Sequence, residues 1–280
     1  DPAAEARMYL LSGIAGGFDP WWHHPTAYSP DRRSYDIAGP VFEWHAENSD
    51  ALHHRTPLVT VGVVRSAQND QFFGRDIGPF YQPRMMGELT QATYRGACHL
   101  LFDAGVPYRP VDLADLGSDP LLPGVLVLPN LAGISDDDCA SIAEYVRAGG
   151  ALIATGMTSL FDEDGEPRKE FGLAGVLGVR VAGPRPERDA LATYDAAGAL
   201  ELRPDAEIAF AESDVVSRYE GSAVRVSVDA DRRVVAVTGS DSSPAIVAGE
   251  YGRGRVVYMP LDLDRRYLRE PQPGHAAILE

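Results

Sequence analysis

The residues that could do chemistry in this sequence gather first at Thr155-Gly156-Met157-Thr158-Ser159, where a strand is predicted to end. In an open parallel α/β sheet, the loops at the carboxyl ends of the strands carry binding or catalysis. An enzyme of this architecture places a cysteine or serine nucleophile at such a turn, activated by its surroundings. This turn has no cysteine, and its serine lacks a G-x-S-x-G context, so we expect no catalytic residue here.

An aromatic run, Trp21-Trp22-His23-His24, is the most suggestive cluster for contact with a ligand. Tryptophan faces stack on the C–H faces of sugars, and histidine N–H groups donate to hydroxyls. The acidic and basic residues at positions 31–33 could brace this loop through a charge-assisted pair or form a solvated surface triplet. Packing in a core is the alternative for the aromatic rings. The candidate substrate-proximal residues are therefore Trp21, Trp22, His23, His24, Asp31 and Arg32.

Metal and cofactor sites are not predicted. The adjacent pairs His23-His24 and His53-His54 point to different sides of a strand or helix, and neither an H-E-x-x-H motif nor a Cys/His zinc spacing occurs. The acidic stretch 162–166 lacks EF-hand spacing, which favours a solvated turn over a cation site. We expect no metal and no cofactor.

A second polar group follows the first predicted strand of the sheet. Strand-end loops are where sites lie in this architecture, but the mixture of aromatic and polar residues could instead face a neighbouring domain or subunit, which we favour. These residues are Arg65, Ser66, Gln68, Asn69, Phe73, Gly74 and Asp76.

Composition excludes several classes of function. The chain has 280 residues, 45% of them hydrophobic, and a formal net charge of −16. Such a field repels phosphate backbones and anionic lipids, so neither nucleic acid nor a membrane surface is an expected partner, whereas a neutral sugar is compatible. The two cysteines define no disulfide framework. No apolar run approaches the ~20 residues of a membrane span and no signal peptide is visible, so a cytoplasmic location is expected.

The elements that must position these residues form an α/β pattern. Strands are predicted at 58–64, 108–113, 125–128 and 151–155, with helices at 87–104 and from Ser135. Ser135 and Asp138 form a capping box, and Gly149-Gly150 ends that helix. This β-α-β-β-α-β order predicts a flavodoxin-like open parallel sheet with right-handed crossovers.

The remaining sequence suggests additions on both sides of that sheet. After Gly183 the alternating segments predict antiparallel strands that extend the sheet or pack on its edge, with hairpin turns at 229–231 and 251–254. Before the sheet, residues 4–12 read as the end of a helix that is broken by Gly13, Gly16 and Gly17, and residues 38–54 read as another helix. The junction Thr56-Pro57 divides the chain into domains 1–56 and 57–280, the latter with a β-rich segment at about 184–260.

Several segments resemble multidomain glycoside hydrolases just after their catalytic barrel: the β-galactosidases with a trimerisation domain and the related α-L-fucosidase-like enzymes. The segments that carry the resemblance are 57–64, 73–76, 126–130, 134–135, 145–150, 155–156, 159–165, 168 and 171–173. The resemblance implies a class I glutamine amidotransferase-like domain that is non-catalytic and builds contacts in a homo-oligomer. It also implies that residues 1–56 are the end of a TIM barrel, with 14–17 leading into its eighth strand.

The catalytic half of such an enzyme is absent from this sequence. Glycoside hydrolysis needs a pair of carboxylates, which by the resemblance come from earlier barrel strands. Glu43 and Glu47 fall on the helix that follows, so we assign neither of them to this pair. We therefore expect a carboxyl-side fragment that is inactive alone, from a protein that hydrolyses a galactoside or fucoside. Two alternatives stay open: a stand-alone sugar-binding or scaffold protein, and an amidotransferase-like hydrolase with an unusual nucleophile.

Overall fold

The chain divides into two compact units, Asp1–Leu58 and Val59–Glu280. The computed structural model describes residues 2–23, 33–56, 58–73, 90–183, 200–202, 207–211, 216–218, 221–239 and 242–271. No helix among these residues is long and apolar enough to cross a membrane.

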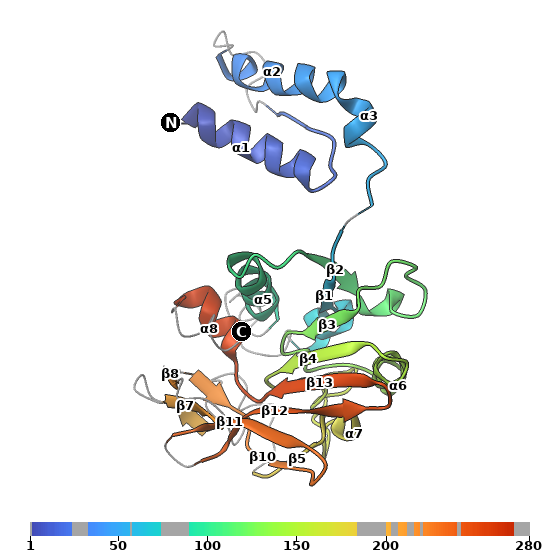
Figure 1. Cartoon of the computed structure of the whole chain (residues 1–280), viewed down its shortest axis with the longest axis vertical. Helices are drawn as coiled ribbons and strands as arrows, with labels where there is room; N and C mark the ends of the chain where they lie inside the picture. The colour runs from blue at the N-terminus through green and yellow to red at the C-terminus, as the bar shows by residue number, and fades with distance from the viewer. Residues whose placement is uncertain are drawn as a thin grey trace. The chain divides into compact units, whose positions relative to one another are not determined.

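The first unit is a pair of packed helices, α1 (Pro2–Ala15) and α2 (Arg33–Glu47), followed by the single turn α3 (Ser49–Leu52) (Figure 1). Leu10 and Ile14 of α1 are buried with Ala38 and Val41 of α2. Helix α1 continues through Gly13, contrary to the prediction, and ends just before Gly16 and Gly17, as predicted. Residues 18–23, which follow the segment 14–17 expected to lead into a barrel strand, are neither helix nor strand.

The second unit is built on a nine-stranded sheet of order β2-β1-β3-β4-β13-β12-β11-β7-β8. Strands from β2 to β13 are parallel, and the neighbours from β13 to β8 are antiparallel. The strands are β1 (Val61–Arg65), β2 (Tyr108–Asp112), β3 (Val125–Leu128), β4 (Ala151–Thr155), β7 (Glu207–Phe210), β8 (Val216–Arg218), β11 (Arg233–Thr238), β12 (Pro244–Tyr251) and β13 (Gly254–Met259).

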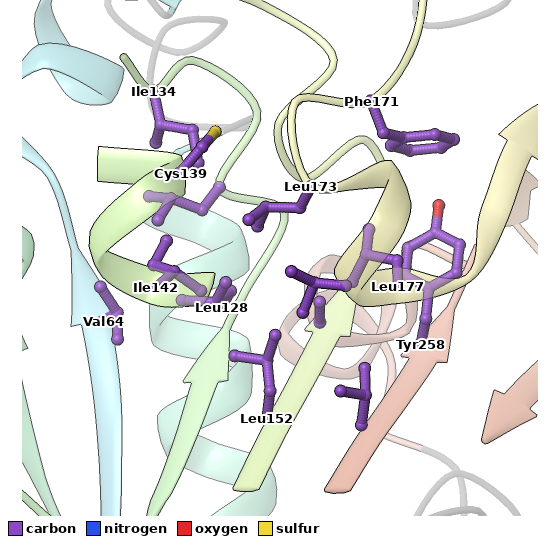
Figure 2. Packing of buried hydrophobic residues seen from close by; sticks show 14 of the residues in the cluster. Val64, Leu128, Ile134, Cys139, Ile142, Leu152, Phe171, Leu173, Leu177 and Tyr258 are labelled. Carbon is purple, nitrogen blue, oxygen red and sulfur yellow. The ribbon is translucent and has the colours of Figure 1, made fainter. Parts of the chain in front are cut away.

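Helices cover both faces of this sheet. Side chains alternate between the two faces along each strand, so the apolar strands contribute to a core on each side. Leu126, Leu128 and Leu152 pack in one core with α6 (Asp136–Arg147) and α7 (Ala174–Leu177), as Figure 2 shows for Leu128, Leu152 and Ile142. On the other face Val127 and Ile153 pack near α5 (Gln91–Asp103) and α8 (Leu263–Arg269), which pack against each other. The unit is therefore a three-layer α/β/α structure.

Helix α6 begins as the sequence predicts. The Ser135 side chain accepts from the Asp138 N–H while the Asp138 carboxylate accepts from the Ser135 N–H, so the capping box is present. Gly149, just after the helix, has a φ of 118° that favours glycine. Cys139, Ile142 and Val146 form the buried face of the helix.

The β-rich segment both extends the sheet and departs from the predicted pairing. The hairpin β12–β13 turns at 251–254 as predicted. The hairpin predicted at 229–231 is wrong: β10 (Val226–Val228) pairs with β5 (Val179–Val181) in a separate two-stranded sheet, and β11 pairs with β7 and β12. The remaining elements are η1 (Asn69–Phe73), η2 (Leu113–Asp115), β6 (Leu200–Leu202) and β9 (Gly221–Ala223).

The predicted fold class is confirmed: an open parallel α/β sheet in the order β-α-β-β-α-β, extended by antiparallel strands. The assignment of residues 1–56 to the end of a barrel stays a prediction.

Candidate functional site

A hollow of about 260 Å³ lies beyond the carboxyl ends of β1 and β3, where the strand order of the parallel sheet reverses. Of the polar residues predicted here, Arg65, Ser66 and Asn69 line it, and Asn69 Oδ1 accepts from the Gly133 N–H at 2.9 Å. Gln68 is exposed, and Gly74 and Asp76 lie outside the described residues.

Charge at this hollow is mixed. Arg65 Nη2 lies 3.9 Å from Asp70 Oδ2. Burial raises the pKa of Asp70, opposed by a hydrogen bond with Thr90 and by the charge of Arg65. The described lining contains neither histidine nor cysteine, and its polar side chains, Arg65, Ser66, Asn69 and Asp70 among them, can hydrogen-bond a polar ligand or a neighbouring chain.

The end of β4, where a nucleophile would stand, is a buried hydrogen-bond network. Thr155 Oγ1 donates to Asp264 Oδ2 and accepts from the Asn130 N–H, at 2.7 and 2.8 Å. Thr158 Oγ1 donates to the Thr155 carbonyl at 2.7 Å, and Ser159 Oγ accepts from the Leu173 N–H at 3.0 Å. These three residues are at most 4% exposed, so each hydroxyl is used to hold the turn and none faces a substrate.

Two further features strengthen this network. Asn130 Oδ1 accepts from the Met157 N–H at 2.7 Å, and Asn130 itself has a φ of 45°, which asparagine tolerates better than most residues. Burial raises the pKa of Asp264 to about 7, although the Thr155 hydroxyl lowers it. Asp264 carries no signal of this role in the sequence, because it stands among other charged residues at the start of a helix.

Neither cysteine is an activated thiol. Burial raises the pKa of Cys139 to about 12 and also raises that of Cys98, which hydrogen-bonds Tyr108 and Tyr94. A thiolate is therefore disfavoured at both positions, whereas a catalytic cysteine needs a lowered pKa.

The acidic turn is tied to its own backbone. Asp162 Oδ1 accepts from the N–H groups of Asp164 and Glu166, at 3.1 and 2.8 Å. This carboxylate shapes the turn as an Asx turn does, which agrees with a solvated turn.

The predicted aromatic cluster is split. Trp21 is 77% exposed and its ring stacks on His23, with centroids 5.4 Å apart and planes at 16°. Trp22 instead packs against the core of the first unit, and its buried Nε1 has no hydrogen-bond partner among the described residues. His24, Asp31 and Arg32 lie outside the described residues.

A different set of side chains converges in the same unit. Asp19, His45 and His53 bring one carboxylate oxygen and two imidazole nitrogens within 4.8 Å of one another. These three residues follow no metal-binding motif spacing, so the sequence does not indicate that they come together. Only the buried position of His45, near the end of an amphipathic helix, could have drawn attention to it.

Comparison with known families agrees with the lack of an exposed nucleophile at the end of β4. The model of the β-galactosidase trimerisation domain matches residues 110–271, which is more than half of the chain. The chain belongs to the β-galactosidase trimerisation domain family. The match begins in β2 and runs through α8, so it includes the buried hydroxyl network and the antiparallel strands.

Relatives of this trimerisation domain include the β-galactosidase BbgII of Bifidobacterium bifidum, 34% identical over 155 residues that make up 54% of this chain and 21% of the relative. Among solved structures, Gan42B, a GH42 β-galactosidase from G. stearothermophilus, is similar with a TM-score of 0.62 at 17% identity, over 86% of this chain and 33% of that one. The α-L-fucosidase isoenzyme 2 of Paenibacillus thiaminolyticus has a TM-score of 0.68 at 17% identity, over 99% of this chain and 40% of that one.

These structural likenesses show the fold. The chain spans about a fifth of the length of BbgII and a third to two fifths of the two solved structures.

Proposed function

We propose that this chain is the non-catalytic, oligomerising portion of a glycoside hydrolase. The observation that carries the proposal is the end of β4, where the hydroxyls of Thr155, Thr158 and Ser159 are buried and hydrogen-bonded. The trimerisation domain family supports the same role. A trimer of identical chains is the assembly we propose.

The intact protein would hydrolyse a galactoside or a fucoside. The names of the β-galactosidase relatives and of the α-L-fucosidase support these two sugars. Hydrolysis by the usual route needs two carboxylates flanking the glycosidic bond. In this proposal both come from a catalytic barrel outside the chain, and the chain contributes assembly and one side of the active-site mouth.

Two measurements on the purified chain test this proposal. Light scattering coupled to size exclusion should give three times the chain mass of 30.2 kDa, with dissociation on dilution. Assays with nitrophenyl β-galactoside and α-L-fucoside should show no turnover above buffer. A monomer at high concentration would contradict the assembly, and turnover that survives repurification would contradict the non-catalytic role.

A stand-alone sugar-binding protein is the second candidate, and the exposed Trp21–His23 stack favours it. A flat, exposed aromatic face is the surface on which a sugar ring stacks. Titration with galactose and fucose should then change tryptophan fluorescence in the native chain and in Trp44→Ala, but not in Trp21→Ala. Trp44 is a suitable control because it is also exposed and lies on α2. An unchanged signal in the native chain would contradict this candidate.

The cytoplasmic location expected from the sequence also stays a proposal. Fractionation of the source cells tests it, and recovery of the protein outside the cytoplasmic fraction would contradict it.

A further inference from the structure

Two imidazoles and one carboxylate converge in the first unit. His53 Nε2 lies 3.1 Å from Asp19 Oδ1, and His45 Nε2 lies 3.8 Å from the same oxygen. The two histidine rings are 5.3 Å apart at their centroids and meet edge to face, at 61°. Both Nε2 atoms therefore point to one carboxylate from different directions.

Three different segments supply these groups. His45 stands in the last turn of α2, His53 is the residue that caps α3, and Asp19 follows the end of α1. The packing of α1 on α2 brings the segments together, and the Arg55 guanidinium adds a hydrogen bond to the Ile14 carbonyl at the end of α1. The site is thus built by the fold of the unit rather than by a local motif.

The spacing suits a small divalent cation. Zinc binds histidine nitrogen at about 2.0–2.1 Å and carboxylate oxygen at about 2.0–2.2 Å, so tetrahedral ligand atoms lie about 3.3 Å from one another. The distances of 3.1 and 3.8 Å bracket that value, and all three ligand atoms lie within 4.8 Å. Small rotations of the side chains would complete the geometry.

Hydrogen bonding alone accounts for only part of the arrangement. The His53–Asp19 contact is a hydrogen bond, but 3.8 Å from His45 is too long for one. The His45 side chain is only 11% exposed, and its imidazole is still directed at the carboxylate. The Asp19 side chain is 81% exposed and remains open to further ligands from solvent. A cation between the three groups would engage all of them.

We propose that Asp19, His45 and His53 form a binding site for a divalent transition metal of the zinc type, with water at the remaining position. Two imidazoles and one carboxylate are ligands that zinc accepts. The metal would connect residues 34 positions apart in sequence and hold the end of α1 to the end of α2. The site is independent of the proposed function, because it needs neither a trimer nor a sugar.

Zinc alone, added to the full chain after treatment with a chelator, is the probe. Isothermal titration should give one tight equivalent, and Co²⁺ in its place should give the visible absorption of a low-coordinate site. His45→Gln, His53→Gln and Asp19→Asn should each weaken zinc binding, on the order of 100-fold for the histidines, since even groups behind the ligands matter 10–100-fold. Zinc should also raise the melting temperature of the native chain and not that of the variants.

His54→Asn is the matched control. His54 neighbours His53 in sequence and in space but is not one of the three ligands, and asparagine tolerates its φ of 55°. This variant should bind zinc as the native chain does. Circular dichroism checks the fold of each variant, and Asp19→Asn keeps the test valid if His45→Gln unfolds, because Asp19 packs in no core. Absence of a tight equivalent, or binding that is unchanged in Asp19→Asn and His53→Gln, would overturn the proposal.

Discussion

Thr155 Oγ1 donates a hydrogen bond to Asp264 Oδ2 at 2.7 Å, although the two residues are 109 positions apart in sequence. The contact joins the end of β4 to the first turn of α8, and both side chains are buried. The position where an enzyme of this architecture would keep a nucleophile is therefore used to attach a helix to the sheet.

Asp264 should make the chain less stable as the pH rises. Its pKa is about 7 in the folded chain and near the ordinary 3.8 when unfolded, so the folded state holds more protons between these values. Protonated Asp264 therefore contributes its full amount to the free energy of unfolding below about pH 4. That contribution decreases as the carboxyl loses its proton, until about pH 7. Urea unfolding across this range should show a smaller loss for Asp264→Asn than for the native chain.

Asp164→Asn is the control for that titration, because Asp164 is exposed in the turn at 162–166. It should keep the pH dependence of the native chain. Parallel curves for the native chain and Asp264→Asn would show that burial does not shift this carboxyl.

Gly96→Ala should destabilise the chain where α5 meets α8. A Cβ on Gly96 would lie 1.7 Å from the Asp264 carbonyl oxygen, and backbone cannot rotate away as a side chain can. We expect a loss of about 1–3 kcal/mol or more in the free energy of unfolding, as for other overpacked sites. Gly175→Ala in α7 meets nothing within 4 Å and should change stability by less than about 1 kcal/mol. Equal unfolding midpoints for the two variants would contradict the close packing of α5 on α8.

Ser135→Ala should cost about 1 kcal/mol of unfolding free energy, the usual value for losing a helix cap. The Ser135 side chain accepts from the Asp138 N–H at 3.1 Å, and alanine would leave that donor without its cap. Ser141→Ala, an exposed serine on the same helix, should change stability little. Denaturant unfolding of both variants provides the comparison, and a Ser135→Ala variant as stable as Ser141→Ala would contradict the capping box.

Thiol labelling should show that the two cysteines lack the reactivity of a catalytic thiol. Because burial raises the pKa of Cys139 to about 12, its reaction with Ellman's reagent at neutral pH should be far slower than that of an unstructured thiol. Denaturation should release both thiols, and Cys139→Ser should remove one of them. Rapid labelling of the native Cys98→Ser variant would show instead that Cys139 is accessible and ionised.

Local signals in the sequence predict much of this fold. The continuous apolar runs around Val63 and Val127 indicate strands buried on both faces, and Ser135 with Asp138 marks the start of α6. The absence of a cysteine after Thr155 is equally legible from residue type alone, whereas the burial of Ser159 is visible only in the structure.

Features that depend on distant pairing escaped the sequence analysis. The turn after Val228 suggested a hairpin, but β10 pairs with β5, a strand that lies far earlier in the sequence, at 179–181. Asp264 is buried only because α8 packs over Gly96, and His45 meets Asp19 only because α1 packs on α2. No spacing rule encodes such contacts, since they arise from tertiary packing. The split between Trp21 and Trp22 has the same origin.

The place of β13 in the sheet bears on how the second unit can fold. Strand β13 follows every other strand of the nine-stranded sheet in sequence, yet it lies in the interior, between β4 and β12. During synthesis β1 to β4 leave the ribosome first, and one edge of β4 stays unpaired until β13, residues 254–259, has also emerged. Assembly of the sheet is therefore a late, non-local event, which the dependence of folding rate on contact order associates with slow folding.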